Sequence, residues 1–191
     1  PGCCCCPGHY CVGGLRFKCP GGTFGGEAGL KALDECGECS AGYYCPSGSI
    51  SGQAHVCGEG YYCPAGSGSP VAPNPGQQLA GGGTTTRTHV TSCDAGYTCS
   101  GGMPSACPAG RYGSDGLSCV DCGSPEVFCP GATGSPERVR EGHFSVGGLG
   151  NTTRTGEEEC VAGTYCSSGL VYDCGSSSVW CGDGASNPSA A

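Results

Sequence analysis

Twenty-one cysteines stand among the 191 residues of the chain, and their spacing is the first feature that could support chemistry. Thiols at this density either oxidise to disulfides or, as thiolates, bind zinc. Two Cys-x2-Cys pairs, Cys36 with Cys39 and Cys119 with Cys122, have the spacing of zinc ligands. The two pairs lie far apart in the chain, however, and the four histidines stand alone. The spacing therefore favours disulfides.

No other residues form a constellation that supports catalysis. The isolated histidines provide no nucleophile with a partnered base. The segment 81–84, Gly-Gly-Gly-Thr, lacks the lysine of a phosphate-binding loop, and we interpret it as a flexible linker. The acidic run 157–159 lacks the alternating spacing of a calcium loop, so we interpret it as a solvated face. We therefore expect a protein that is not an enzyme and that uses no cofactor or metal.

The composition offers little material for a hydrophobic core. Forty glycines and 14 prolines accompany only four phenylalanines and one tryptophan. Without cross-links such a chain would be disordered, because nothing would offset the entropy lost on ordering its backbone. Disulfides that close short loops can replace the missing core. Disulfides at this density persist outside the cytosol, so we expect an extracellular protein, secreted or at the cell surface.

The charge and hydropathy exclude two classes of partner. The formal net charge of −8 argues against nucleic acid and anionic membranes. No apolar run approaches the length of a membrane span. The sequence begins at Pro1, and we expect any signal peptide to have been removed or to lie outside the numbered residues.

The cysteine spacing repeats along the chain. The pattern Cys-x5-Cys-x7-Cys occurs three times, beginning at Cys5, Cys93 and Cys160. The first two occurrences continue through Cys-x2-Cys to a further cysteine. We therefore divide the chain into a repeat unit 1 with an extra Cys-x5-Cys (1–63), a Gly/Pro/Thr-rich linker (64–92), a repeat unit 2 (93–129), a Gly-rich tract open to glycosylation (130–159) and a truncated repeat unit 3 (160–191).

A shorter motif recurs inside these units. Five segments read Cys-x-x-Gly, then two residues that usually include Tyr, then Cys, and they begin at Cys5, Cys39, Cys57, Cys93 and Cys160. Two further segments, 19–25 and 107–113, end in Gly in place of the second Cys. We expect the glycine to form a turn with positive φ and the aromatic ring to pack on the adjacent disulfide. The tyrosines in these motifs are therefore predicted to be packing residues.

Regular secondary structure is predicted to be sparse. Turn residues recur every few positions, so only short two-stranded β-hairpins have room to form. The segment 27–36 contains enough Ala, Leu, Lys and Glu for a helical turn or two. The predicted fold class is small and disulfide-rich, with tandem cysteine-rich modules.

The motifs resemble known extracellular modules. The segment 107–122, Cys-Pro-Ala-Gly-Arg-Tyr-Gly-Ser-Asp-Gly-Leu-Ser-Cys-Val-Asp-Cys, resembles the ephrin-receptor-like cysteine-rich repeat, which is related in layout to TNF-receptor and EGF-like modules. The Gly-Tyr-Tyr-Cys-Pro-x-Gly-Ser runs at 42–49 and 60–67 resemble arrays in large extracellular proteins of algae and other protists, including mastigoneme proteins of flagellar hairs. Such a resemblance identifies the type of module well but the biological role poorly.

The TNF-receptor layout implies two small loops, closed by Cys19 with Cys36 and by Cys107 with Cys119. Four cysteines in the next cluster allow three connectivities. We expect the interlocked connectivity, in which the first cysteine is bonded to the third and the second to the fourth. These cysteines are Cys39, Cys45, Cys57 and Cys63.

Three cysteines near the start, Cys3, Cys4 and Cys6, have no counterpart in these families. Because 21 is odd, at least one cysteine cannot pair within the chain. We therefore expect Cys3, Cys4 and Cys6 to be candidates for an interchain disulfide.

Two stretches are candidates for glycosylation. Asn151-Thr152-Thr153 is an N-glycosylation sequon in a Gly-rich, cysteine-free tract. The alternative for Asn151 is an unmodified loop. A threonine-rich patch is typical of O-glycosylated segments, with an unmodified flexible loop as its alternative. Its members are Thr84, Thr85, Thr86, Thr88 and Thr91.

Two hypotheses for function follow. The first is a structural component of an extracellular filament or surface coat, such as a flagellar hair, which associates with itself or with other coat proteins. The second is a ligand-binding ectodomain segment of a receptor or adhesin, with 64–92 and 130–159 as recognition loops. The second is weaker because these tracts lack the clustered Trp, Tyr and Arg residues that interfaces favour.

Overall fold

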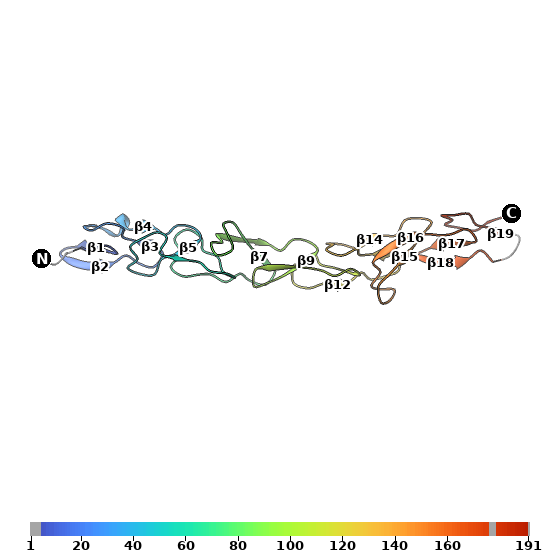
Figure 1. Cartoon of the computed structure of the whole chain (residues 1–191), viewed down its shortest axis with the longest axis horizontal. Coiled ribbons are helices and arrows are strands. Elements are labelled where there is room, and N and C mark those ends of the chain that lie inside the picture. Colours follow the sequence, from blue (N-terminus) through green and yellow to red (C-terminus); the bar gives the residue numbers. More distant parts are fainter. Residues whose placement is uncertain (1–4, 176–178, 191) are drawn as a thin grey trace. The chain divides into compact units, whose positions relative to one another are not determined.

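A computed structural model describes residues 5–175 and 179–190 of the chain (Figure 1). The chain divides into two compact units, and we describe each by itself. The N-terminal unit extends to Ser92 and includes Ser100–Met103. The C-terminal unit comprises Cys93–Cys99 and the chain from Pro104 onward.

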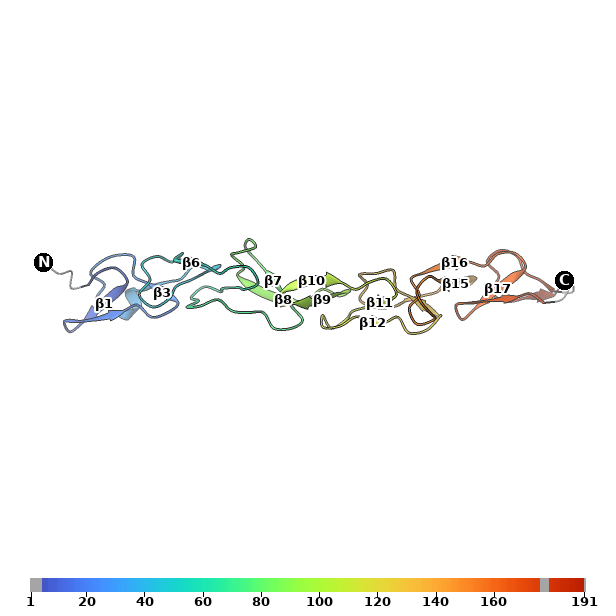
Figure 2. The ribbon, with the colours of Figure 1, turned by 60° about the horizontal axis from the view of Figure 1, so that its bottom comes forward.

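The described secondary structure consists of ten two-stranded antiparallel hairpins and one 3-10 turn. Within the N-terminal unit the hairpins follow one another in chain order (Figures 1 and 2). They are β1 (His9–Val12) with β2 (Leu15–Lys18), β3 (Thr23–Phe24) with β4 (Gly37–Glu38), β5 (Tyr43–Tyr44) with β6 (His55–Val56), and β7 (Gln77–Ala80) with β8 (His89–Ser92). The next hairpin, β9 (Tyr97–Ser100) with β10 (Met103–Ala106), lies where the chain passes from one unit to the other.

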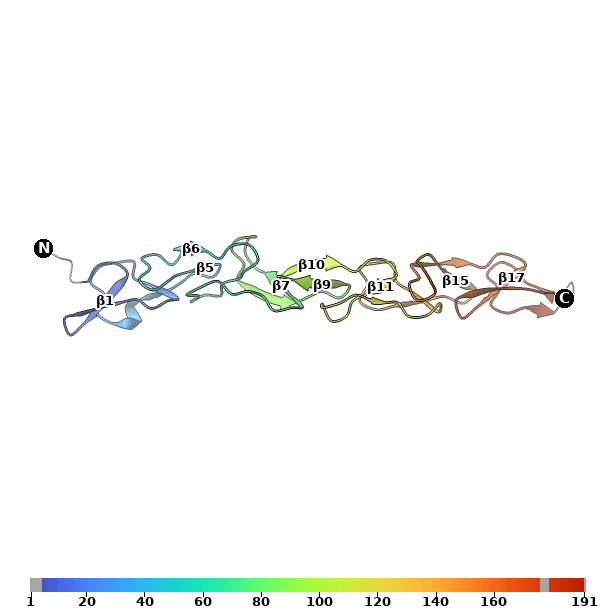
Figure 3. The ribbon, with the colours of Figure 1, turned by 90° about the horizontal axis from the view of Figure 1, so that it is seen from below.

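The C-terminal unit repeats this organisation (Figure 3). Its hairpins are β11 (Arg111–Tyr112) with β12 (Val120–Asp121), β13 (Val127–Phe128) with β14 (Glu137–Arg138), β15 (His143–Val146) with β16 (Gly156–Glu159), β17 (Thr164–Ser167) with β18 (Leu170–Asp173), and β19 (Val179–Trp180) with β20 (Ser189–Ala190). The small disulfide-rich fold class with short hairpins is therefore confirmed.

The helical prediction for 27–36 is wrong except for one 3-10 turn, η1 (Leu33–Glu35). Backbone groups of the segment bond to the first motif instead, since the amide of Gly29 donates to Cys5 and the carbonyl of Leu30 accepts from Cys11. These bonds hold the start of the segment extended, and an α-helix cannot form there.

The buried core consists of half-cystines. Every buried hydrophobic residue in the described part of the chain is a cysteine. The aromatic rings are mostly half-buried and stack across hairpins, with ring centroids 5.5 Å apart for Tyr10 and Phe17 and 5.3 Å apart for Tyr165 and Tyr172. Sulfur atoms thus take the place that aliphatic side chains occupy in an ordinary domain.

Nine disulfides hold the described chain. Two close the loops that the TNF-receptor layout implied, Cys19–Cys36 and Cys107–Cys119. The other seven are local and join residues six or seven positions apart. They are Cys5–Cys11, Cys39–Cys45, Cys57–Cys63, Cys93–Cys99, Cys122–Cys129, Cys160–Cys166 and Cys174–Cys181.

The interlocked pairing of Cys39 with Cys57 and of Cys45 with Cys63 is therefore corrected to two local bonds. The turn between Cys39 and Cys45 brings their Cα atoms to 5.9 Å, and the turn between Cys57 and Cys63 does the same. This separation suits a disulfide directly. A short loop also costs less entropy to close than a long one.

Backbone hydrogen bonds link most of the cysteine motifs to the next one along the chain. The amide of the cysteine that opens a motif donates to the carbonyl of the turn glycine one motif earlier, at 2.8 to 3.1 Å. Seven such bonds occur: Cys19 to Gly8, Cys39 to Gly22, Cys57 to Gly42, Cys107 to Gly96, Cys122 to Gly110, Cys160 to Gly142 and Cys174 to Gly163. The glycine amide in turn donates to the residue that closes the next motif, as Gly22 does to Cys45 at 2.8 Å. Each unit is therefore stabilised mainly between neighbouring motifs, as in repeat proteins.

The tracts 64–92 and 130–159 contain two further motifs that have no cysteine. In 73–79 the amide of Gln77 donates to Asn74, and in 139–145 the amide of His143 donates to Arg140, both at 3.1 Å. The same turn bond joins Tyr43 to Ser40 in a cysteine motif. The tracts that we expected as a linker and a Gly-rich tract therefore fold as the hairpins β7–β8 and β15–β16.

Other contacts replace the disulfide in these two motifs. In 73–79 the side chains of Pro73 and Leu79 both lie against Gly102. In 139–145 the second cysteine position holds Ser145, which is buried and donates its hydroxyl to the carbonyl of Gly169 at 3.2 Å. Sequence reasoning missed both motifs because it searched for cysteines. The turn glycines Gly76 and Gly142, 66 positions apart, are the signal that could have found them.

Candidate functional site

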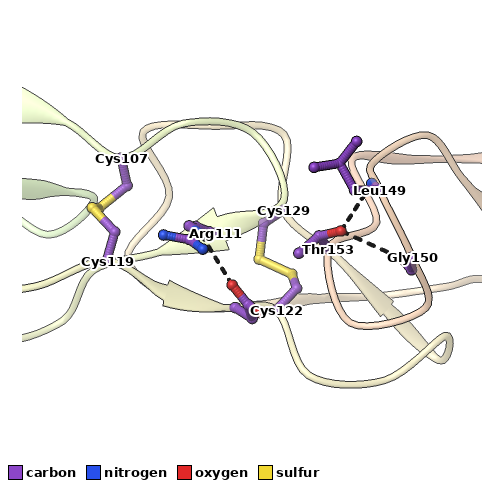
Figure 4. Close-up of polar contacts among 9 residues, drawn as sticks. Cys107, Arg111, Cys119, Cys122, Cys129, Leu149, Gly150 and Thr153 are labelled. Carbon is purple, nitrogen blue, oxygen red and sulfur yellow. Dashed lines mark hydrogen bonds and ion pairs between the residues drawn. A yellow bond between two sulfur atoms is a disulfide. The ribbon is translucent and has the colours of Figure 1, made fainter.

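The loop that carries the N-glycosylation sequon connects β15 to β16 in the C-terminal unit. Two backbone bonds hold it beside the Cys122–Cys129 disulfide (Figure 4). The amide of Gly123 donates to the carbonyl of Thr152 at 3.0 Å, and the amide of Cys129 donates to the carbonyl of Arg154 at 2.9 Å. The loop is therefore anchored at both ends of a disulfide-closed turn.

Within the loop, the sequon side chains are ordered by their own hydrogen bonds. The hydroxyl of Thr153 accepts from the amide of Leu149 at 3.0 Å and donates to the carbonyl of Gly150 at 3.4 Å (Figure 4). Asn151 is exposed, and its Oδ1 accepts from Arg154 Nη2 at 2.7 Å. N-linked glycans attach to the other amide atom, Nδ2, which makes no hydrogen bond to any residue that the structure describes. The folded loop therefore presents the attachment atom.

The hairpin beneath the sequon loop is held by an ion pair. Glu157 on β16 accepts from the backbone amide of Arg140 at 2.8 Å and also from its Nε. Burial raises the pKa of Glu157, but the hydrogen bonds and charge of Arg140, together with the charge of His143, outweigh it, so this pKa lies below its usual range. The run 157–159 is thus not a uniform solvated face, because only Glu158 and Glu159 are exposed.

Four of the five threonines of the patch lie in the equivalent loop of the N-terminal unit, between β7 and β8, and the fifth, Thr91, lies on β8. The amide of Gly58 donates to the carbonyl of Thr85, and the amide of Cys63 donates to the carbonyl of Arg87, both at 2.9 Å. The segment 81–84 is therefore part of an anchored hairpin loop.

The five candidate threonines fall into two groups. Thr84, Thr85 and Thr91 are exposed. Thr86 and Thr88 are half-buried, and their hydroxyls bond to the amide of Gly83 and to His89 Nδ1, both at 2.9 Å. The first group presents free hydroxyl surface, whereas the second stabilises the loop.

The cysteine candidates for an interchain bond are only partly described. Cys3 and Cys4 lie outside the described residues. Cys6 is half-buried, and its carbonyl accepts from the amide of His9 at 3.2 Å.

The two Cys-x2-Cys pairs that could have bound zinc are divided between separate disulfides. Cys36 is bonded to Cys19 and Cys39 to Cys45. In the C-terminal unit Cys119 and Cys122 are divided in the same way, between the disulfides to Cys107 and Cys129 (Figure 4). These cysteines therefore form the disulfides of neighbouring motifs and are not zinc ligands.

Among the residues that the structure describes, no helix has the length and apolar character to cross a bilayer.

Comparisons with known proteins leave the family open. No protein-family model matches the chain, and none of the curated proteins matches it.

Proposed function

We propose that the chain is a structural, non-enzymatic component of an extracellular filament or surface coat, of the flagellar-hair kind, and that it carries an N-glycan at Asn151. The observation that carries this proposal is the ladder of backbone bonds between neighbouring motifs, most of which also have a disulfide of their own. Stability of this kind grows with the number of motifs and needs no central core. Nine disulfides also fit an oxidising compartment.

Assembly would join the chain to further copies or to other coat proteins. The odd number of cysteines supports a covalent contribution, because at least one of the 21 has no partner of its own within these 191 residues. The exposed sequon and the exposed threonines would place glycans on the outside of such an assembly.

Electron microscopy of native material, together with non-reducing electrophoresis, tests the proposal. We expect ordered filaments or sheets, and disulfide-linked multimers that reduction converts to monomers. Dispersed monomers with one titratable thiol would contradict it.

A further inference from the structure

A pocket opens in the N-terminal unit at a position that six other motifs fill. In six motifs a Cβ atom on the turn glycine would meet a backbone carbonyl of a later segment at a distance that real Cβ atoms do not show. These glycines are Gly8, Gly22, Gly42, Gly96, Gly110 and Gly142. At Gly60, the turn glycine of 57–63, no atom lies within 4 Å of the same point. The open space has a volume of about 180 Å³ and is lined by Glu59, Gly60, Leu79, Thr84, Arg87 and Met103.

The C-terminal unit differs from the N-terminal unit at the corresponding place. The motif 122–129 has one more residue than 57–63. Its Pro125 carbonyl lies directly against Gly169. In the N-terminal unit the equivalent glycine, Gly102, lies against Leu79 and Pro73 instead. The carbonyl of Pro125 thus takes the place beside Gly169 that the side chain of Leu79 takes beside Gly102, and in the shorter motif the space beside Gly60 stays open.

Two charged side chains line the pocket, the half-buried Arg87 and the exposed Glu59. In the C-terminal unit the guanidinium of Arg154 donates to Gly147 and Asn151, at 3.3 and 2.7 Å. Its counterpart Arg87 makes no side-chain hydrogen bond or ion pair with any residue that the structure describes, and neither does the carboxylate of Glu59. One cation and one anion thus border a surface formed by Leu79 and Met103.

We propose that this pocket binds a small zwitterion, an α-amino acid with an aliphatic side chain. The guanidinium of Arg87 pairs with the ligand carboxylate, which matches its planar donors. Glu59 accepts from the ligand ammonium group. Leu79 and Met103 contact the aliphatic side chain, and Met adapts to its shape.

The size of the pocket and the charges around it suit a ligand of this class. Pockets for drug-sized molecules occupy roughly 300–1,000 Å³, so about 180 Å³ admits only a much smaller one. The N-terminal unit carries four of the eight basic residues but only five of the 16 acidic ones, so its field does not oppose a carboxylate strongly. A ligand with so few atoms binds weakly, with a Kd of about 1 mM.

Titration of the isotope-labelled, disulfide-intact chain with L-leucine tests the site by NMR. Saturable shifts of the Gly60 and Thr84 amides and of the Met103 methyl group are expected. Two truncated probes, 4-methylpentanoate and 3-methylbutylamine, each lack one charge. Both should bind at least about fivefold more weakly than leucine, because each leaves one pocket charge without its partner.

Matched variants assign the contacts. Arg87→Gln should weaken leucine at least about fivefold and leave 3-methylbutylamine unchanged, whereas Glu59→Gln should weaken leucine and leave 4-methylpentanoate unchanged. Arg154→Gln, at the equivalent position of the C-terminal unit, is the control and should not alter leucine binding. The proposal is overturned by shifts that do not saturate below about 50 mM leucine, by truncated probes that bind as tightly as leucine, or by an equal loss in Arg154→Gln.

Discussion

The carbonyl oxygen of Gly66 lies where a Cβ atom on Gly22 would have to stand. Gly22 also has φ +92°, a backbone conformation that disfavours any other residue. Its amide and carbonyl bond to Cys45 and Cys39 in the next motif. Gly22 thus forms a turn, allows the close approach of Gly66 and makes two of the backbone bonds that link neighbouring motifs.

Replacing Gly22 by alanine is therefore expected to disrupt the ladder locally. The left-handed backbone costs about 1–2 kcal/mol, and displacement of Gly66 adds to it. Hydrogen exchange should show lost protection of the Cys39 and Gly22 amides. Gly163→Ala is the matched control, because Gly163 has φ +90° but no atom within 4 Å of its Cβ position. Equal losses in the two variants would refute the role of the close approach.

The local pairing of Cys39 with Cys45 predicts a definite peptide map. Proteolysis of the non-reduced chain between Cys45 and Cys57, for example by thermolysin at Ile50, should release two separate cystine peptides. One contains Cys39–Cys45 and the other Cys57–Cys63. Mass spectrometry that instead finds the two halves still linked would support the interlocked pattern.

Loss of one local staple should destabilise the fold less than loss of a longer loop. Closing the short loop of Cys39–Cys45 contributes about 2 kcal/mol, and closing the longer loop of Cys19–Cys36 about 3 kcal/mol. Chemical denaturation of the double serine variants should therefore rank Cys19→Ser/Cys36→Ser below Cys39→Ser/Cys45→Ser in stability. The reverse order would contradict this account of the staples.

The β15–β16 hairpin is expected to weaken in acid. Because the pKa of Glu157 is lowered in the folded chain, its stabilisation is complete above the ordinary carboxyl value of 4.5 and is lost as pH falls from there through the folded value. The exposed Arg140 side chain limits the effect to about 0.5–1 kcal/mol. Hydrogen exchange of the Ser145 amide, followed against pH, measures it. Glu157→Gln should remove this dependence, whereas Glu158→Gln, on the exposed neighbour, should keep it.

Glycosylation at Asn151 predicts a mass change that depends on one hydroxyl. Enzymatic removal of N-glycans should lower the mass of the native chain and leave that of Asn151→Gln unchanged. Thr153→Ser should keep the glycan and the loop bonds, because the hydroxyl remains. Thr153→Ala should lose both, since this hydroxyl completes the sequon and also accepts from Leu149. An unchanged native mass would show that the sequon is unused.

Cysteine spacing and turn chemistry in the sequence alone determined the fold class and the position of most turns. The motif that begins with Cys-x-x-Gly spans only seven residues, so its effect is local and can be inferred without knowledge of distant residues. The loops Cys19–Cys36 and Cys107–Cys119, which the structure contains, were implied by the resemblance to TNF-receptor modules.

Tertiary structure alone decided what depends on residues far apart in the chain. The contact between Gly22 and Gly66 joins positions that no motif connects. The sequence therefore did not show that the close approach of Gly66 also requires a glycine at position 22. The motifs 73–79 and 139–145 were missed because Leu79 and Ser145 replace half-cystines only through their contacts with Gly102 and Gly169. A disulfide marks a module in the sequence, whereas packing and hydrogen bonds reveal one only after the chain has folded.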